Sequence, residues 1–118
     1  MSLVTQTVPG SYGVFAATVE EVLAAAGDTT SWVGLHGQLA VQITGDASQI
    51  TLQVERSTRR PTRTVEPNTA PAGEPISGDP SAGIQTCAYT EPGIAWWRVR
   101  CVSIEGGSAV VAINGLGV

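Results

Sequence analysis

The sequence contains few residues that could serve as a catalytic base or as a metal ligand. His36 is its only histidine, and it lies between Leu35 and Gly37. A catalytic serine or cysteine needs a neighbouring base, and a metal site needs several convergent ligands, neither of which one histidine supplies. We therefore interpret His36 as a structural residue at a strand edge or turn, and we predict no metal and no cofactor.

Carboxylates could supply a second kind of chemistry, because two of them at a suitable separation can hydrolyse a glycosidic bond. Glu20 and Glu21 are adjacent in the chain, whereas Glu55 and Glu66 could meet only through folding. Nothing in either spacing is characteristic of such a pair. The prediction from these residues is a protein that is not an enzyme.

Arginine supplies all six positive charges of the chain. Four of the arginines cluster between residues 56 and 63. Because a guanidinium pairs with a carboxylate through two parallel hydrogen bonds, one interpretation is that Arg59, Arg60 and Arg63 bind acidic groups on a neighbouring subunit. The other interpretation is a solvated loop.

The adjacent tryptophans Trp96 and Trp97 suggest a further kind of binding. Successive residues of a strand point to opposite faces, so we expect Trp97 in the core and Trp96 at a subunit contact. A carbohydrate-binding module that stacks a sugar on tryptophan is the alternative from a different functional class. An exposed pair of aromatic residues on one face would favour that alternative.

Cys87 and Cys101 are the two cysteines of the sequence. They lie on consecutive expected strands, and antiparallel pairing with a small register offset could bring them opposite each other as a disulfide. Two buried thiols are the favoured alternative, because we expect the chain to be made in the reducing cytosol. A bond between subunits is a third arrangement.

The composition of the chain bears on whether it binds nucleic acid or a membrane. Charged residues make up 14% of the 118 residues, hydrophobic residues make up 42%, and the net charge is −4. An acidic chain is a poor ligand for nucleic acid. No apolar run approaches the ~20 residues that span a bilayer, and we see no secretory signal. We therefore expect neither a nucleic-acid nor a membrane partner.

Alternation of apolar and polar residues is the main structural pattern, and it predicts short strands joined by Gly-, Asp- and Pro-containing turns. The expected strands are 39–44, 50–55, 84–90, 96–104 and 109–114. If Arg98 and Arg100 face water, the residues that alternate with them face inward, which are Trp97, Val99 and Cys101. The expected core is Leu39, Val41, Ile43, Ile50, Leu52, Val54, Trp97, Val99, Val111 and Ile113. This pattern predicts an all-β fold, an antiparallel, jelly-roll-like β-sandwich.

The remaining segments are less regular. Residues 1–12 read as an extended N-terminal arm, and residues 13–118 as a single sandwich domain with a proline-rich surface excursion at 57–81. A capping box formed by Thr18 and Glu21 predicts one short helix near residues 19–26. The alternative for this region is a strand from Tyr12 to Val22, since β-branched residues also occur there.

Four segments together resemble a family of small phage and prophage proteins. They are residues 39–45 (LAVQITG), 50–57 (ITLQVERS), 91–101 (EPGIAWWRVRC) and 106–110 (GGSAV). The resemblance covers residues 35–113, and it departs after Ser57, where relatives tend to carry an Asp-Gly turn and a tryptophan. Members of this family are believed to be β-sandwich components of the head surface or tail of the virion.

The resemblance implies a structural role in a bacteriophage particle. The expected function is a capsid decoration or cement protein that stabilises the head by binding the major capsid protein or other virion proteins. By analogy it would be a homo-oligomer, with a trimer favoured, and it would be located in the virion after synthesis in the host cytoplasm. A tail- or neck-associated component and a carbohydrate-binding host-adhesion module remain the alternatives.

Overall fold

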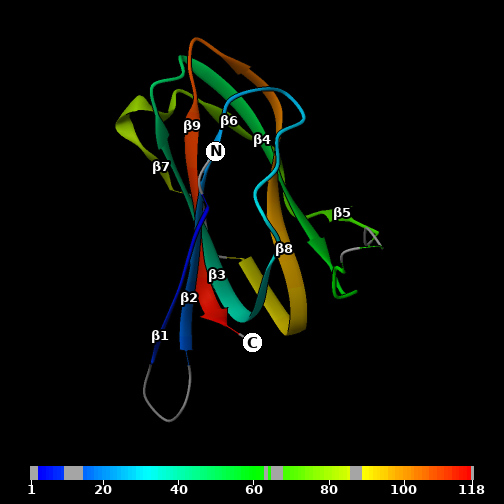
Figure 1. Ribbon diagram of the computed structural model, residues 1–118. Helices are drawn as coiled ribbons and strands as arrows, with labels where there is room; N and C mark the ends of the chain where they lie inside the picture. The colour runs from blue at the N-terminus through cyan, green and yellow to red at the C-terminus, as the bar shows by residue number, and fades with distance from the viewer. Residues whose placement is uncertain (1–2, 10–14, 63, 65–67, 86–88, 118) are drawn as a thin grey trace.

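The computed structural model describes residues 3–9, 15–62, 64, 68–85 and 89–117, and these form almost entirely antiparallel β-structure (Figure 1). The strands are β1 (Leu3–Pro9), β2 (Phe15–Leu23), β3 (Val33–Gly45), β4 (Gln49–Ser57), β5 (Ala70–Pro71), β6 (Ile76–Gly78), β7 (Ile84–Gln85), β8 (Tyr89–Glu105) and β9 (Ala109–Gly117). A 3-10 turn, η2 (Pro80–Ala82), precedes β7. No helix in the described part of the chain is long and apolar enough to cross a bilayer.

The strands are hydrogen-bonded in the order β1-β2-β9-β3-β8-β4-β5, with β6 beside β4 and β7 beside β3. The first half of β8 pairs with β3, and its second half pairs with β4. Because β8 changes partner along its length, the hydrogen-bonded path folds into two layers. Figure 1 shows β1, β2 and β9 on one side of the molecule and β8 with β4 on the other. The predicted antiparallel β-sandwich is therefore confirmed.

The core lies between these layers. All ten residues expected there are buried, with exposed fractions of 0–2%. Trp97 is the largest of the fully buried side chains, and Val99 and Cys101 follow it on the inner face of β8. The prediction succeeded because a residue on a half-buried strand can change face only if the whole strand slips in register.

The short helix predicted near residues 19–26 is wrong, because this segment continues β2 as far as Leu23. Val19, Glu21 and Leu23 are buried while Glu20 is exposed, which is the alternation of a strand. Pairing with β1 on one side and β9 on the other outweighs the local capping signal. The alternative of a strand gives the right type of element, although residues 10–14 lie outside the described part.

Residues 1–12 were expected to be an arm, but the described part, Leu3–Pro9, is a strand that pairs with β2 along its full length. Between β4 and β7, the proline-rich segment 57–81 contains the short strands β5 and β6 and the turn η2. Both short strands pair with β4. The excursion therefore returns to the sheet and covers the outer edge of β4.

Candidate functional site

The outer face of β8 carries an alternating row of side chains that the core does not use. Inward residues of this strand are buried, whereas the outward ones are partly or fully exposed. The outward residues are Ile94, Trp96, Arg98, Arg100 and Val102. Ile94 is 52% exposed and Val102 is 43% exposed, so apolar groups stand at both ends of a row with two arginines near its middle.

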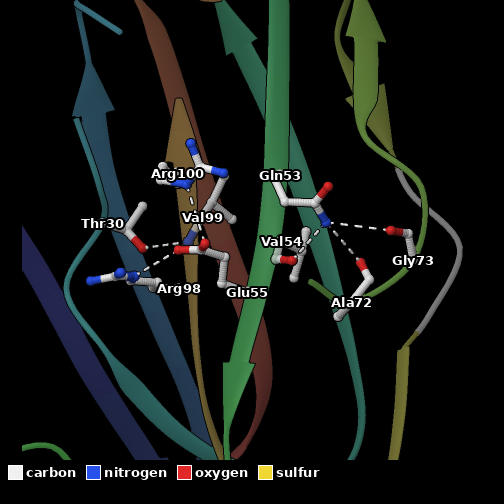
Figure 2. A network of polar contacts seen from close by, with 9 residues as sticks. All are labelled: Thr30, Gln53, Val54, Glu55, Ala72, Gly73, Arg98, Val99 and Arg100. Carbon is white, nitrogen blue, oxygen red and sulfur yellow. Dashed lines mark hydrogen bonds and ion pairs between the residues drawn. The ribbon is translucent and has the colours of Figure 1, made fainter. Parts of the chain in front are cut away.

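Glu55 of β4 lies opposite Arg98 in the sheet and joins the two arginines. Arg98 Nε donates to Glu55 Oε1 at 2.9 Å, and Arg100 Nε donates to Glu55 Oε2 at 3.2 Å (Figure 2). The exposed fractions of the side chains are 10% for Glu55, 16% for Arg98 and 40% for Arg100. One carboxylate thus meets two guanidinium groups.

Trp32 adds an aromatic ring to the same face. Its ring centroid lies 4.5 Å from the Cζ of Arg98, a cation–π contact. The pairing of Val33 with Trp97 and of Gly34 with Trp96 places the segment before β3 alongside β8. Trp96 is partly exposed. We call Trp32, Glu55, Trp96, Arg98 and Arg100 the arginine–tryptophan face.

Hydrogen bonds of the two preceding residues, Thr30 and Ser31, hold the segment that carries Trp32. Thr30 N donates to Val99 O at 2.9 Å, and Val99 N donates to Thr30 Oγ1 at 3.0 Å. Figure 2 shows the Thr30 side chain directed at the backbone of β8. Ser31 N donates to the buried Glu21 Oε2 at 2.7 Å. The segment that leads into β3 is therefore attached both to β8 and to β2, which holds Trp32 over the arginine.

Gln53 of β4 holds the edge of this strand that lies away from β8. Its Nε2 donates to Val54 O at 2.8 Å, to Gly73 O at 3.3 Å and to Ala72 O at 3.4 Å (Figure 2). Ala72 N in turn donates to Val54 O at 2.8 Å. These bonds hold the segment that follows β5 against β4, so the strand that carries Glu55 is supported on both edges.

Among the described residues, the arginines gather around this strand pair. Arg59 and Arg60 are exposed and follow directly after the end of β4, where Ser57 pairs with Trp96. Arg56 pairs with Trp97 in the same ladder. Arg63, the third arginine predicted to bind a neighbour, lies outside the described residues.

Exposed carboxylates lie at the other end of β4. Asp46 is in the turn that precedes the strand, and Glu105 pairs with Gln49 at its start. Ser108 N donates to Asp46 Oδ1 at 2.9 Å, and this hydrogen bond lowers the pKa of Asp46. Positive and negative groups are thus separated along the length of β4, about 25 Å for nine residues.

The residues considered for catalysis do not converge in the described structure. Glu20 is exposed and Glu21 is buried, so these neighbours face opposite sides of β2. Glu55 is held by two arginines, and Glu66 lies outside the described residues. His36 is partly buried on β3 beside a register shift. Within the described ranges, no three His, Cys, Asp or Glu residues form a group that could hold a metal ion.

Cys101 is a buried free thiol on the inner face of β8. Burial raises the pKa of Cys101, and the negative charge of Asp28 raises it further. Cys87 lies outside the described residues, so the suggested pairing of the two cysteines stays a prediction.

Of the five residues of the arginine–tryptophan face, sequence reasoning named only Trp96 as a contact residue and missed the other four. Glu55 was considered only as a possible partner of Glu66, and Arg98 only as a residue that faces water. The meeting of Glu55 and Arg98 depends on β4 pairing with β8 in this register. The opposite charges of these residues were the only signal available. Trp32 lies outside any alternating pattern, so nothing in its local sequence indicated the contact with Arg98.

The comparisons with known proteins found similarity to solved structures alone. No protein-family model and no curated protein matches the sequence. Among solved structures, the Drosophila melanogaster CENP-C cupin domain is similar over 94% of this chain and 73% of its own, with 10% identity and a TM-score of 0.35. The cobalt form of HppE matches 95% of this chain and 52% of its own, with 9% identity and a TM-score of 0.37. Peruvianin-I, a cysteine peptidase from Thevetia peruviana latex, matches 98% of this chain and 61% of its own, with 14% identity and a TM-score of 0.30.

Proposed function

We propose that this chain is a non-enzymatic structural protein of a bacteriophage particle, which decorates the capsid and reinforces it by binding the major capsid protein. The observation that carries the proposal is the gathering of basic groups around β4 and β8 in a chain of net charge −4. A localised basic surface on an acidic protein favours binding to a neighbour that presents carboxylates. The resemblance of the sequence to phage structural proteins supports the same role.

The proposed contact uses three kinds of group. Arg59 and Arg60 are exposed at the end of β4 and are able to pair bidentately with carboxylates of the shell. Trp96 and Ile94 supply apolar area close to them on the outer face of β8. Glu55 is already saturated by two arginines, so its role is to hold Arg98 and Arg100 in place rather than to transfer protons.

Reinforcement requires many copies rather than one strong contact. A modest interaction repeated in every subunit gains through avidity what it lacks individually, and a capsid offers such repetition around its symmetry axes. The protein would therefore act in the virion as a homo-oligomer, with a trimer proposed by analogy with other decoration proteins. A position on the neck or tail is the alternative within the same structural class.

A binding experiment tests the role of the exposed arginines. Particles that lack the protein are mixed with wild-type protein, with Arg59→Ala/Arg60→Ala, and with the charge-conserving Arg59→Lys/Arg60→Lys. Sedimentation then measures the bound fraction. We expect at least a ~10-fold loss of affinity for the alanine pair and a smaller loss for the lysine pair. Glu74→Gln, an exposed substitution elsewhere, is the control and should bind normally. Normal binding by the alanine pair would refute the proposed contact.

A carbohydrate-binding module is the second candidate, because Trp32 and Trp96 share the outer face of the sandwich. The ring of Trp32 already carries Arg98, so Trp96 is the residue on which a sugar would stack. Titration of host surface polysaccharide into wild-type protein and into Trp96→Ala distinguishes the two functions. Binding that Trp96→Ala abolishes, together with normal attachment of Arg59→Ala/Arg60→Ala to particles, would favour adhesion over decoration.

A further inference from the structure

The edges of the sheet are covered unequally. β7 pairs with β3 beyond the part that pairs with β8, and β5 and β6 pair with the outer edge of β4. The segment 27–30 covers the edge of β8, because Gly27 N donates to Cys101 O and Thr30 N donates to Val99 O. Within the described part of the chain, β1 is bonded to β2 alone and ends the hydrogen-bonded path. Figure 1 shows β1 at the margin of the molecule, with β2 on its inner side.

The sequence of β1 does not protect this edge. Soluble proteins usually guard a long edge strand with lysine, an inward charge, a bulge or a short length. β1 has seven residues, LVTQTVP, none of them charged, and it pairs with β2 without a register shift. Of the features that protect an edge strand, β1 has only a proline, Pro9, at its end. A regular, uncharged edge of this length is a template for another strand.

The five central residues of β1 read identically in both directions about Gln6. Val4-Thr5-Gln6-Thr7-Val8 is a palindrome. If two copies of β1 pair antiparallel around a two-fold axis through Gln6, every one of these residues lies opposite a residue of its own type. β-branched and Thr–Thr pairs are favourable across antiparallel strands, and the absence of charge removes like-charge repulsion at the axis. A slip by one residue would lose this matching.

We infer that β1 is a self-association edge, through which two copies of this chain join their sheets in the order β9-β2-β1-β1-β2-β9. The partner is a second copy because a two-fold contact requires a self-complementary surface, which a palindromic strand provides. The inference does not depend on the proposed capsid role, since the edge and its sequence are properties of the chain alone.

The contact is expected to be weak in dilute solution. A pair of seven-residue edges buries much less than the ~1,200 Å² of a stable interface, so dimers should form only at high protein concentration. Copies held close together on a surface would associate more readily, because the second contact becomes intramolecular.

Cysteine cross-linking tests the register directly, in a background in which Cys87 is replaced by serine. Facing Cα atoms in antiparallel strands are about 4.5–5.5 Å apart, within the range of a disulfide. Under mild oxidation, Gln6→Cys should cross-link to itself, and a mixture of Val4→Cys with Val8→Cys should cross-link to each other. Val4→Cys alone and Leu3→Cys alone are matched controls on the same strand, because their copies would be ~13 Å or more apart.

The outcomes separate the inference from random association and from other oligomers. Cross-linking of Gln6→Cys at least ~10-fold faster than Leu3→Cys supports the two-fold contact, whereas equal rates for both refute it. In sedimentation, Gln6→Lys should raise the dimer dissociation constant by about tenfold or more, because it places two ammonium groups at the axis. Thr44→Lys, which adds the same charge at an exposed position of inner strand β3, should not. A trimer unaffected by Gln6→Lys would also refute the inference.

Discussion

Replacing Glu55 by glutamine should destabilise the sandwich by about 2–3 kcal/mol. The substitution keeps the size of the side chain but removes the charge between Arg98 and Arg100. A hydrogen bond to a charged group is worth about 1.5–3 kcal/mol when it is shielded from water, and Arg98 meets this condition with a side chain only 16% exposed. Arg100 is 40% exposed, so solvent screening limits its share to ~1 kcal/mol or less.

Thermal unfolding converts this estimate into a measurable shift. With an unfolding entropy of about 2.1 cal/mol/K per residue, a chain of 118 residues loses about 4 °C of Tm for each kcal/mol. Glu55→Gln should therefore lower Tm by about 8–12 °C. Calorimetry on Glu55→Gln, Arg98→Gln and the double variant gives the coupling between the two side chains.

Arg100→Gln is the matched control, because it removes the more exposed of the two arginines and should cost ~1 kcal/mol or less. Two results would refute the reasoning. One is a Tm for Glu55→Gln within about 2 °C of the wild type, which would mean that the ion pair contributes nothing net. The other is an equal loss for Arg98→Gln and Arg100→Gln, which would mean that burial does not decide the strength of these contacts.

Three further predictions concern the turns and the buried thiol. The hydrogen bond from Ser108 lowers the pKa of Asp46 below its ordinary value of 3.8. The stability that this carboxylate contributes is therefore present above that value and is lost as pH falls through the folded-state pKa. In urea unfolding from pH 6 to pH 2.5, Asp46→Asn should lose less stability than the wild type. Burial raises the pKa of Cys101. In a Cys87→Ser background, a thiol reagent at pH 8 should therefore label Cys101 only at the rate of unfolding. Labelling at the rate of an exposed thiol would contradict the buried position of Cys101. Gly45→Ala should destabilise by about 2 kcal/mol or more in urea titration, because the residue has φ +135 and an added Cβ would collide with the carbonyl oxygen of Ser108. Ala substitution of the exposed Ser103 should change little.

The sandwich core could be predicted from the sequence because alternation on a strand is a strict geometric rule. Leu39, Val41 and Ile43 are buried together, as are Ile50, Leu52 and Val54, since each set is fixed by the pleat once its strand has one face in the core. The segment near residues 19–26, which was predicted as a helix, does not have such an unambiguous sequence pattern. There a local helix signal competed with partners far away in the chain, and the pairing of β2 with β9 decides the outcome.

The candidate site was less predictable because it depends on which strands are neighbours. Trp96 was identified by residue type, but the positions of Glu55 and Trp32 beside Arg98 follow from the order of strands. Single-strand patterns contain no information on that order. Likewise, the palindrome of β1 is visible in the sequence, but its meaning appears only when the strand is found at the end of the sheet.

Cryo-electron microscopy of the phage particle tests the central claim most directly. The proposal predicts oligomers of the sandwich, arranged with the symmetry of the shell, on the outer surface of the capsid, with Arg59, Arg60 and Trp96 facing acidic groups of the major capsid protein. The same density should disappear from particles prepared with Arg59→Ala/Arg60→Ala. Density only at the neck or tail, or a sandwich whose β4–β8 face points into solvent, would contradict the account.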